Sequence, residues 1–370
     1  MSNTNGLPAA GDKLPYRKNA CLLNKQILST MIILAMLLVF IFGQARTWRQ
    51  LSWSVFWNNC RDVSLLDAFA AIVMTYIGFL TRAVRWKVFL RPMKQVSSMR
   101  LLGPTIIGFT GLALLGRVGE LIRPYMIARN EDLRFSSQIA VLAVERVFDS
   151  IAVGTLIAAF LAFSPELKSL PYLAQFRRAV VVLVALTTVF ACALLLLASR
   201  RQSFSNVLYR TLSPLSPRLA QRASHQFQLF GAELNLIRDA RSLAQIIILS
   251  LATWFVSGLS QYATVYALSS ARQITIGGGM LLLGLGVLGS LVQIPGGGSQ
   301  QLVTMAALVR MFGLRPELAI TCTILGWFTI FMAPVPTGLF LLRHEGLRLH
   351  KLSEKTQQSA AVAESEKQPF

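Results

Sequence analysis

The sequence predicts an all-α protein that crosses a membrane several times, and three observations carry this prediction. Only 14% of the 370 residues are charged and 54% are hydrophobic, whereas soluble domains carry about 25% charged residues. The mean hydropathy is +0.55. Several apolar runs approach or exceed the roughly 20 residues that a helix needs to cross a bilayer. This composition argues against a soluble globular enzyme.

Six of these runs are predicted to be full membrane spans. In chain order they are residues 26–43, 65–80, 136–163, 179–198, 243–268 and 318–342. The first follows a polar segment with four Lys and Arg residues, as the core of a signal peptide would. We interpret it as an uncleaved span, because the run is long and no strong small-residue cleavage site follows it.

Two further apolar stretches, 101–115 and 276–294, are rich in glycine and end in helix breakers. The breakers are GRVG at 116–119 and PGGG at 295–298, and each is followed by another partly apolar segment. Interrupted helices are tolerated at membrane depth only where they are buried in protein or line a cavity. We therefore predict two re-entrant hairpins beside about six full spans, which makes eight helical segments.

The distribution of charge predicts the orientation. The chain has 36 Lys and Arg against 16 Asp and Glu, a formal net charge of +20. If both hairpins enter and leave on one side, 26 of the cationic residues fall on one side of the membrane and nine on the other. Because cytoplasmic loops are enriched in Lys and Arg, both termini are expected in the cytoplasm. Nucleic acid, the usual partner of a very basic soluble protein, is therefore not expected.

The two hairpins then lie on opposite faces of the membrane, and their breaks look related. Gly116 and Gly119 correspond to Pro295 and Gly298, 179 residues later. Equivalent breaks in opposite orientation are typical of inverted-repeat transporters, whose binding site lies near the bilayer midplane. The alternative is two unrelated glycine-rich segments.

This topology divides the chain into three parts. Residues 1–25 are expected to form a cytoplasmic segment and 26–343 the membrane domain, with a cytoplasmic Arg-rich loop at 199–242. The end of that loop has the spacing of an amphipathic helix, which suits either the inner leaflet or the surface of the bundle. Residues 344–370 are polar and are expected to be a disordered tail.

The third predicted span carries ionisable side chains near the expected bilayer centre. Glu145 and Asp149 share a helix face, and Arg146 reaches Asp149 at i,i+3. Such residues face the protein interior or water, since each costs at least ~2.5 kcal/mol in lipid. Two acids outnumber one arginine, which predicts another cation or a proton nearby, and Arg117 or Arg123 is the candidate cation. The alternative is a buried ion-pair cluster with a purely structural role.

The first breaker is the other candidate site. Gly116 and Gly119 allow a tight turn, and the free amides of a helix starting at about Gly119 favour an anion. Arg117 and Arg123 supply guanidinium groups that suit phosphate. Glu120 could complement the helix dipole or pair with Arg123. The alternative is an ordinary positive cytoplasmic loop.

The second breaker carries no charge. The amides of Gly297 and Gly298 could form an anion nest, with Ser299, Gln300 and Gln301 as polar lining, although a simple helix break is an equal alternative. The four cysteines are scattered and the three histidines lie in loops or the tail, so no metal, cofactor or Ser–His–Asp centre is predicted.

Four features together resemble the transmembrane, flippase-like domain family of lysylphosphatidylglycerol synthases. They are the sequence GRVGELIRPYMIAR from Gly116, the sequence ERVFD from Glu145, the span containing Trp254, and the PGGG break. The resemblance covers residues 26–343 and implies a multi-pass protein of the bacterial inner membrane. In bifunctional members this region is thought to move aminoacylated phospholipid between leaflets, while a separate soluble domain makes that lipid.

The resemblance implies roles for Gly116, Arg117, Gly119, Glu120 and Arg123 in the first motif. In the second motif it implies roles for Glu145, Arg146 and Asp149. The late motif normally continues to a Glu where this chain has Gln301. An uncharged amide cannot bind a cation or carry a proton in the same way, which argues against a lysyl-type headgroup.

The sequence thus favours a lipid transporter over an enzyme, because no synthase domain is expected after the last span. We expect it to bind an anionic headgroup, from a phospholipid or a polyprenyl phosphate, near the midplane through Arg117, Arg123 and Arg146. The alternatives are an integral-membrane transferase with Glu145 or Asp149 as base, and an accessory protein that partners a lipid-biosynthesis enzyme.

Overall fold

The computed structural model describes residues 52–199, 240–290 and 298–345, together with six positions between 206 and 221. From Ser54 onward these residues belong to one compact unit. Within the described part the chain is helical and contains no strand, only an isolated bridge between Val63 and Leu268. The predicted all-α class is therefore confirmed.

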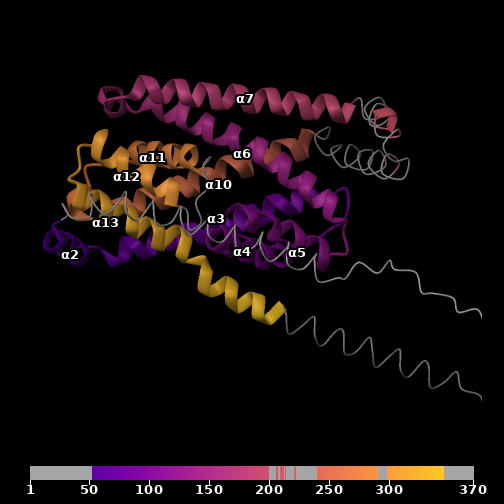
Figure 1. The fold of residues 1–370 in the computed structure, drawn as a ribbon, viewed down its shortest axis with the longest axis horizontal. Helices are drawn as coiled ribbons and strands as arrows, with labels where there is room; N and C mark the ends of the chain where they lie inside the picture. Colours follow the sequence, from indigo (N-terminus) through magenta and orange to yellow (C-terminus); the bar gives the residue numbers. More distant parts are fainter. Residues whose placement is uncertain are drawn as a thin grey trace, which may run out of the picture. The chain divides into compact units, whose positions relative to one another are not determined.

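The helices follow the apolar runs of the sequence (Figure 1). In chain order they are α2 (Trp53–Arg61), α3 (Leu65–Leu90), α4 (Ser98–Leu115), α5 (Ile122–Asn130), α6 (Phe135–Phe163), α7 (Leu173–Ser199), α10 (Ala240–Tyr266), α11 (Ile276–Gly289), α12 (Gly298–Arg310) and α13 (Pro316–Gly326). A π-helical turn, η6 (Trp327–Met332), extends α13, and the helical chain continues to Glu345.

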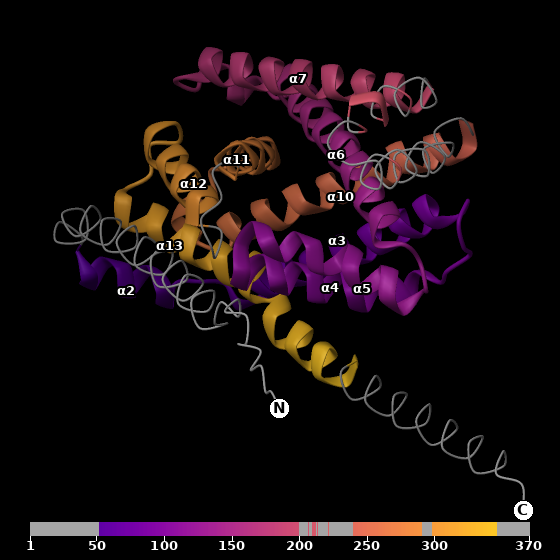
Figure 2. The same ribbon diagram turned by 45° about the vertical axis from the view of Figure 1, so that its right-hand side comes forward.

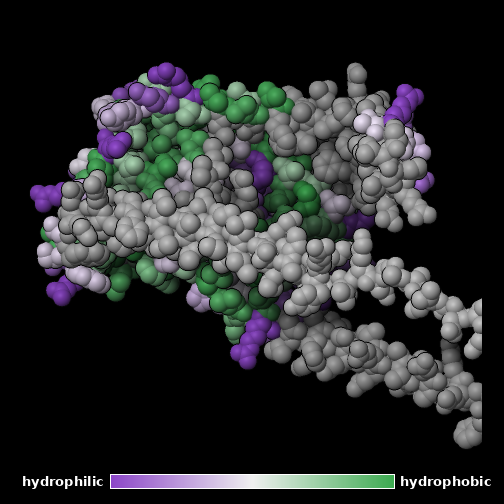
Figure 3. Space-filling view, viewed as in Figure 1, coloured by the Kyte–Doolittle hydropathy of each residue, from purple (hydrophilic) through white to green (hydrophobic). Residues whose placement is uncertain are grey.

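Five helical stretches are long and apolar enough to cross a membrane. They are Leu65–Leu90, Ser98–Leu115, Phe135–Phe163, Ala240–Tyr266 and Pro316–Glu345. Hydrophobic side chains cover much of the visible surface of the described helices (Figure 3). The predicted span at 26–43, most of the loop at 199–242 and nearly all of the tail lie outside the described residues.

The first glycine-rich segment folds into a hairpin. The chain leaves α4 through a 3-10 turn, η1 (Gly116–Leu121), and returns along α4 as α5. Gly116 has φ = 64°, a conformation that glycine adopts without strain. The returning helix begins at Ile122, three residues later than the sequence predicted, because the breaker forms the 3-10 turn rather than the first turn of the helix.

The second glycine-rich segment also folds back on itself. Helices α11 and α12 pack side by side, as both ribbon views show (Figures 1 and 2). A Cβ on Gly286 would lie 3.0 Å from Cγ of Gln300, and one on Gly289 would lie 3.0 Å from the Ser299 carbonyl oxygen. The glycines therefore allow the two arms to approach closely. The break itself, residues 291–297, lies outside the described residues.

The two halves of the described bundle use the same packing scheme. In the first half α3 packs on α4, α4 on α5, and α5 on α6; in the second half α10 packs on α11, α11 on α12, and α12 on α13. The long helices α3 and α10 pack against each other between the halves. This order is what an internal repeat produces, and its inverted orientation in the membrane stays a prediction.

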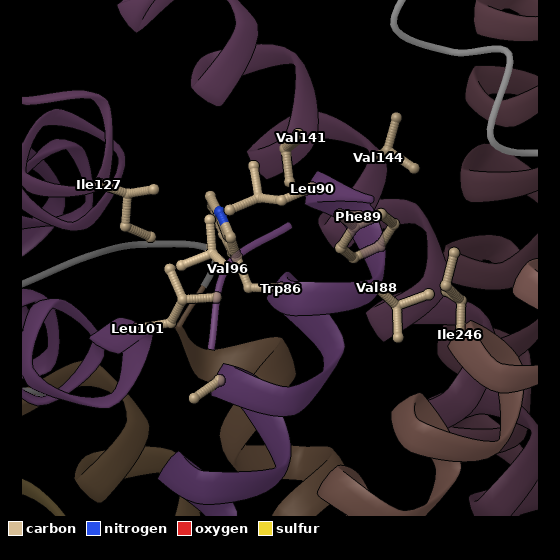
Figure 4. Close-up of a cluster of buried hydrophobic side chains, with 11 residues drawn as sticks. Trp86, Val88, Phe89, Leu90, Val96, Leu101, Ile127, Val141, Val144 and Ile246 are labelled. Atoms are coloured by element: carbon tan, nitrogen blue, oxygen red, sulfur yellow. The ribbon is translucent and has the colours of Figure 1, made fainter. Parts of the chain in front are cut away.

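One predicted boundary is wrong. The sequence predicts that the second span ends at residue 80, but α3 continues to Leu90 and carries Arg82, Arg85 and Lys87. Its last turns are buried with α4, α5, α6 and α10 in a core cluster centred on Trp86 (Figure 4). The two arginines stand among the apolar residues of this extension and lower its average hydropathy. A simple hydropathy window therefore ends the span too early.

Close packing inside the first hairpin yields a testable prediction. A Cβ on Gly119 would lie 2.1 Å from the carbonyl carbon of Gly111, whereas one on Gly103 would meet nothing within 4 Å. Gly119→Ala should destabilise the protein by about 1–3 kcal/mol, because the backbones must separate.

The readout is thermal unfolding of the purified protein in detergent, with Gly103→Ala as the matched control. Gly103 lies within α4 directly before Pro104, and a Cβ there meets no other part of the protein within 4 Å, so alanine at this position should lower the melting temperature far less than Gly119→Ala. Equal melting temperatures for the two variants would contradict the packing described for this hairpin.

Candidate functional site

Two carboxylates at the middle of α6 form the centre of the site. Asp149 is the central residue of this 29-residue helix, and Glu145 lies one turn earlier. Both residues are buried, Glu145 completely. Their i,i+4 spacing places both side chains on one helix face, as the sequence predicted, and this face contacts α3, α5 and α10. At this depth a carboxylate must be matched by cations and hydrogen bonds.

Arg85 of α3 bridges the two carboxylates. Its Nη1 lies 2.6 Å from Oδ1 of Asp149, and its Nη2 donates to Oε1 of Glu145. Nη1 also lies 2.8 Å from the Ser250 hydroxyl of α10. The Arg85 side chain is completely buried, so the bridge is a dry, charge-assisted contact between helices of both halves.

Arg123 of α5 supplies a second cation to Glu145. Its Nη1 lies 3.2 Å from Oε2, and its guanidinium carbon lies 3.9 Å from the centroid of the Trp86 ring. Trp86 in turn donates to Gln138 of α6 at 3.1 Å. The expectation that Arg123 or Arg117 compensates the acids is confirmed for Arg123, which pairs with Glu145 rather than with Glu120.

Arg85 is the residue that the sequence interpretation missed. It lies beyond residue 80, where the second span is predicted to end, although Ala83, Trp86, Phe89 and Leu90 continue the apolar face of that helix. An arginine on such a face is a signal of burial against an acid. Two buried arginines, Arg85 and Arg123, therefore compensate the negative charge of Glu145 and Asp149.

Arg146 differs from these two arginines because it faces open space. Its side chain is 46% exposed although it lies in the middle of α6. Its Nη2 lies 3.6 Å from Oε2 of Glu145 and 3.5 Å from Oδ2 of Asp149. Trp254 of α10 donates to Oδ1 of Asp149 at 2.8 Å, so both oxygens of that carboxylate have partners.

The space in front of Arg146 is a cavity of about 310 Å³ between the two halves. Residues from α3, α4, η1, α6, α10, α11, α12 and η6 line it, so both hairpins border it. Its charged lining residues are Arg82, Glu120, Arg146 and Asp149, all from the first half. The lining from the second half is apolar or consists of hydroxyl and amide groups. A pocket of this size can hold a small polar headgroup.

Arg82 of α3 borders the cavity one turn before Arg85. Its guanidinium carbon lies 5.0 Å from the centroid of the Phe109 ring and 5.7 Å from that of Trp254. Nη1 donates to the Gly78 carbonyl at 3.2 Å, and Nη2 to the Ser257 hydroxyl at 3.5 Å. The guanidinium therefore lies between aromatic rings of both halves.

The structure brings most of the predicted site residues of the first half together. Gly116, Glu120, Arg146 and Asp149 line the cavity. Glu145 and Arg123 are buried in the adjoining ion-pair network, and Gly119 lies at the contact with α4. The backbone of Arg117 lies in η1, and its side chain is outside the described part of the structure.

The second hairpin contributes to the cavity two of its three predicted polar lining residues. Ser299 and Gln300 line the cavity, whereas Gly298 and Gln301 are not among its lining residues. Oε1 of Gln301 lies 3.9 Å from where a Cβ on Gly326 would be, so this amide faces α13. Gly297 lies outside the described residues. Within the described parts of the chain, no three His, Cys, Asp or Glu residues are grouped as a metal ion would need.

Fold and site define a multi-pass helical membrane protein with a charged cavity between two packed hairpins. The chain belongs to the family of the lysylphosphatidylglycerol synthase TM region, whose model matches residues 26–338. The resemblance inferred from the sequence motifs is therefore confirmed. No curated protein and no solved structure shows significant similarity to the chain.

The buried network yields a second prediction. Arg85→Met should destabilise the protein by about 3–5 kcal/mol, because it leaves two buried carboxylates without their bridging cation. Thermal unfolding in detergent measures the effect, and Arg91→Met is the control, since Arg91 lies at the exposed end of the same helix.

A triple variant separates charge imbalance from lost packing. Arg85→Met combined with Glu145→Gln and Asp149→Asn removes the cation and both charges, and should recover part of the lost stability. If Arg85→Met and Arg91→Met unfold at the same temperature, Arg85 does not hold the helices together.

Proposed function

We propose that this protein moves lipids with an anionic headgroup between the two leaflets of the bacterial inner membrane, with the headgroup passing through the cavity. The observation that carries the proposal is the cavity itself, because it places charged residues inside an apolar bundle and is bordered by both hairpins. Charged groups at such depth are costly and usually mark a substrate or ion pathway.

The balance of charge around the cavity favours an anion. Glu145 and Asp149 are already matched by Arg85 and Arg123 inside the protein. Among the described side chains, Arg146 and Arg82 then remain on the cavity surface with Glu120 as the further acid. The guanidinium groups that face the cavity can therefore donate hydrogen bonds to a phosphate, whose oxygens match their planar N–H donors.

The family membership supports a lipid as the cargo. Its name refers to the membrane region of a synthase of lysylphosphatidylglycerol, an aminoacylated phospholipid. In this chain the second hairpin contributes Ser299 and Gln300 to the cavity and has Gln301 where an acid was expected. This uncharged wall suits an anionic headgroup better than a cationic lysyl group.

The hairpins suggest how such a cavity could open to either side. If both termini lie in the cytoplasm, one hairpin enters the membrane from the cytoplasmic side and the other from the outer side. Small movements of either hairpin against the α3–α10 pair would expose the cavity to one face, as in transporters built from inverted repeats. The acyl chains would stay in the lipid, because the described helices present apolar side chains outward.

A reconstitution assay tests the proposal and supplies a third prediction. Proteoliposomes with the purified full chain should move fluorescently labelled phosphatidylglycerol to the opposite leaflet faster than protein-free vesicles. Arg146→Gln should slow this movement at least tenfold, because a charge-assisted contact to the headgroup is lost. Arg100→Gln, on a side chain that is 73% exposed, is the control and should behave as the wild type.

The competing functions give different results in the same experiment. A transferase would convert labelled lipid into a new product when a donor is added. An accessory protein for a lipid-biosynthesis enzyme would show neither movement nor turnover. Either result with correctly folded protein would overturn the proposal.

A further inference from the structure

Among the described arginines of the site, Arg82 stands apart because it forms no ion pair with a described acid. Arg85, Arg123 and Arg146 each form ion pairs with Glu145 or Asp149. Among the described residues, no carboxylate forms an ion pair with Arg82. It nevertheless lies within the membrane-spanning helix α3, about 12 Å from its end at 1.5 Å per residue. A charge at that depth needs a counter-charge.

The surroundings of Arg82 hold its guanidinium in place without neutralising it. Phe109 and Trp254 face it with their rings, an arrangement that favours a cation but leaves its charge intact. Of its five N–H donors, the Gly78 carbonyl and the Ser257 hydroxyl engage one each among the described groups. Donors therefore remain available to a group in the cavity.

The neighbouring residues leave room for the Arg82 guanidinium and hold its aromatic contacts in place. A Cβ on Gly78 would lie 3.1 Å from Nη1 of Arg82, so the glycine leaves the room in which the guanidinium folds back along its own helix. Trp254 is fixed by its bond to Asp149. Asp149 is itself held by Arg85, so the ion-pair network orients the ring that holds Arg82.

We propose that Arg82 binds the phosphate of the transported lipid, and that the cavity selects a headgroup that carries hydroxyl groups and no amine. This inference rests on the proposed function and names the substrate class for it. The phosphate supplies the counter-charge that Arg82 lacks, through the paired donors with which arginine binds phosphate.

The cavity wall formed by the second half determines which chemical groups the rest of the headgroup can carry. The second half lines the cavity with Ser257, Ser260, Ser290, Ser299 and Gln300, and with no acid among its described residues. An ammonium group at this wall would lack an adjacent counter-charge, which is costly, because the acids that line the cavity, Glu120 and Asp149, both lie in the first half. A glycerol or sugar hydroxyl would instead exchange hydrogen bonds with these side chains.

The serine hydroxyls are oriented to accept. Ser257 donates to the Thr253 carbonyl at 2.8 Å, Ser260 to the Ala71 carbonyl at 2.9 Å, and Ser290 to the Val287 carbonyl at 2.7 Å. Each proton is thereby directed to the backbone, and each oxygen keeps a lone pair. These oxygens can accept hydrogen bonds from hydroxyl donors on a headgroup.

A binding assay tests the inference without relying on transport. The detergent-solubilised full chain is titrated with phosphatidylglycerol, phosphatidylethanolamine and phosphatidylcholine of equal chain length, and binding is followed by the rise in melting temperature. Phosphatidylglycerol should stabilise the wild type most. Arg82→Gln should weaken its apparent affinity at least tenfold, whereas Arg91→Gln should leave it unchanged.

Two further variants guard against simple misfolding. Arg82→Lys keeps the charge but loses the paired donors, and should recover part of the affinity. Gly78→Ala keeps the arginine but displaces its guanidinium, and should weaken binding although no charge is removed. Inorganic phosphate and glycerol phosphate, added separately, test whether the ligand is a free phosphate compound rather than a lipid.

The outcomes separate this inference from the proposed function. Equal binding of phosphatidylglycerol by wild type and Arg82→Gln overturns the role of Arg82, even if the wild type moves lipid. Equal binding of phosphatidylethanolamine overturns the headgroup selection. Arg82-dependent binding of inorganic phosphate in preference to lipid overturns the lipid assignment. Arg82-dependent lipid binding without lipid movement supports the site and overturns the transport function.

Discussion

The contact of Arg85 with Glu145 and Asp149 is the interaction on which the rest of the structure depends. It joins α3 to α6 in the interior of the bundle, and Ser250 and Trp254 of α10 extend it to the second half. Each partner alone would be an uncompensated charge among apolar side chains. The helices must therefore pack in the register that brings these groups together, which fixes the walls of the cavity.

The same network explains why the arginines of the site have different roles. Arg85 and Arg123 are consumed by the carboxylates and are almost fully buried, so they are structural residues that hold and orient others. Arg146 shares the carboxylates but is open to the cavity, and the described side chains and carbonyls that contact Arg82 are aromatic or neutral. The positive charges of Arg82 and Arg146 therefore lie at the cavity, where a ligand can reach them.

The sequence predicted most of the fold but only part of the site. Long apolar runs locate α6, α10 and the helical stretch Pro316–Glu345 to within a few residues, because hydropathy reports directly on contact with lipid or a dry core. The glycine breaks predicted both hairpins, and the acids of α6 stood out as charges in an apolar run. Arg82 and Arg85 were missed because positive charges near a span end look like loop residues.

The second hairpin shows what local pattern cannot supply. The sequence named Ser299, Gln300 and Gln301 alike as polar lining. A helix rotates each successive residue by about 100°, and of these three residues Ser299 and Gln300 line the cavity whereas Gln301 does not. Only the packing of α12 on α11 fixes that rotation.

We infer that the cavity holds one anionic lipid headgroup. Native mass spectrometry of the protein extracted from its membrane tests it most directly. The account predicts one retained anionic phosphate lipid, lost in Arg82→Gln; retention of only zwitterionic lipid, or of none by the wild type, would contradict it.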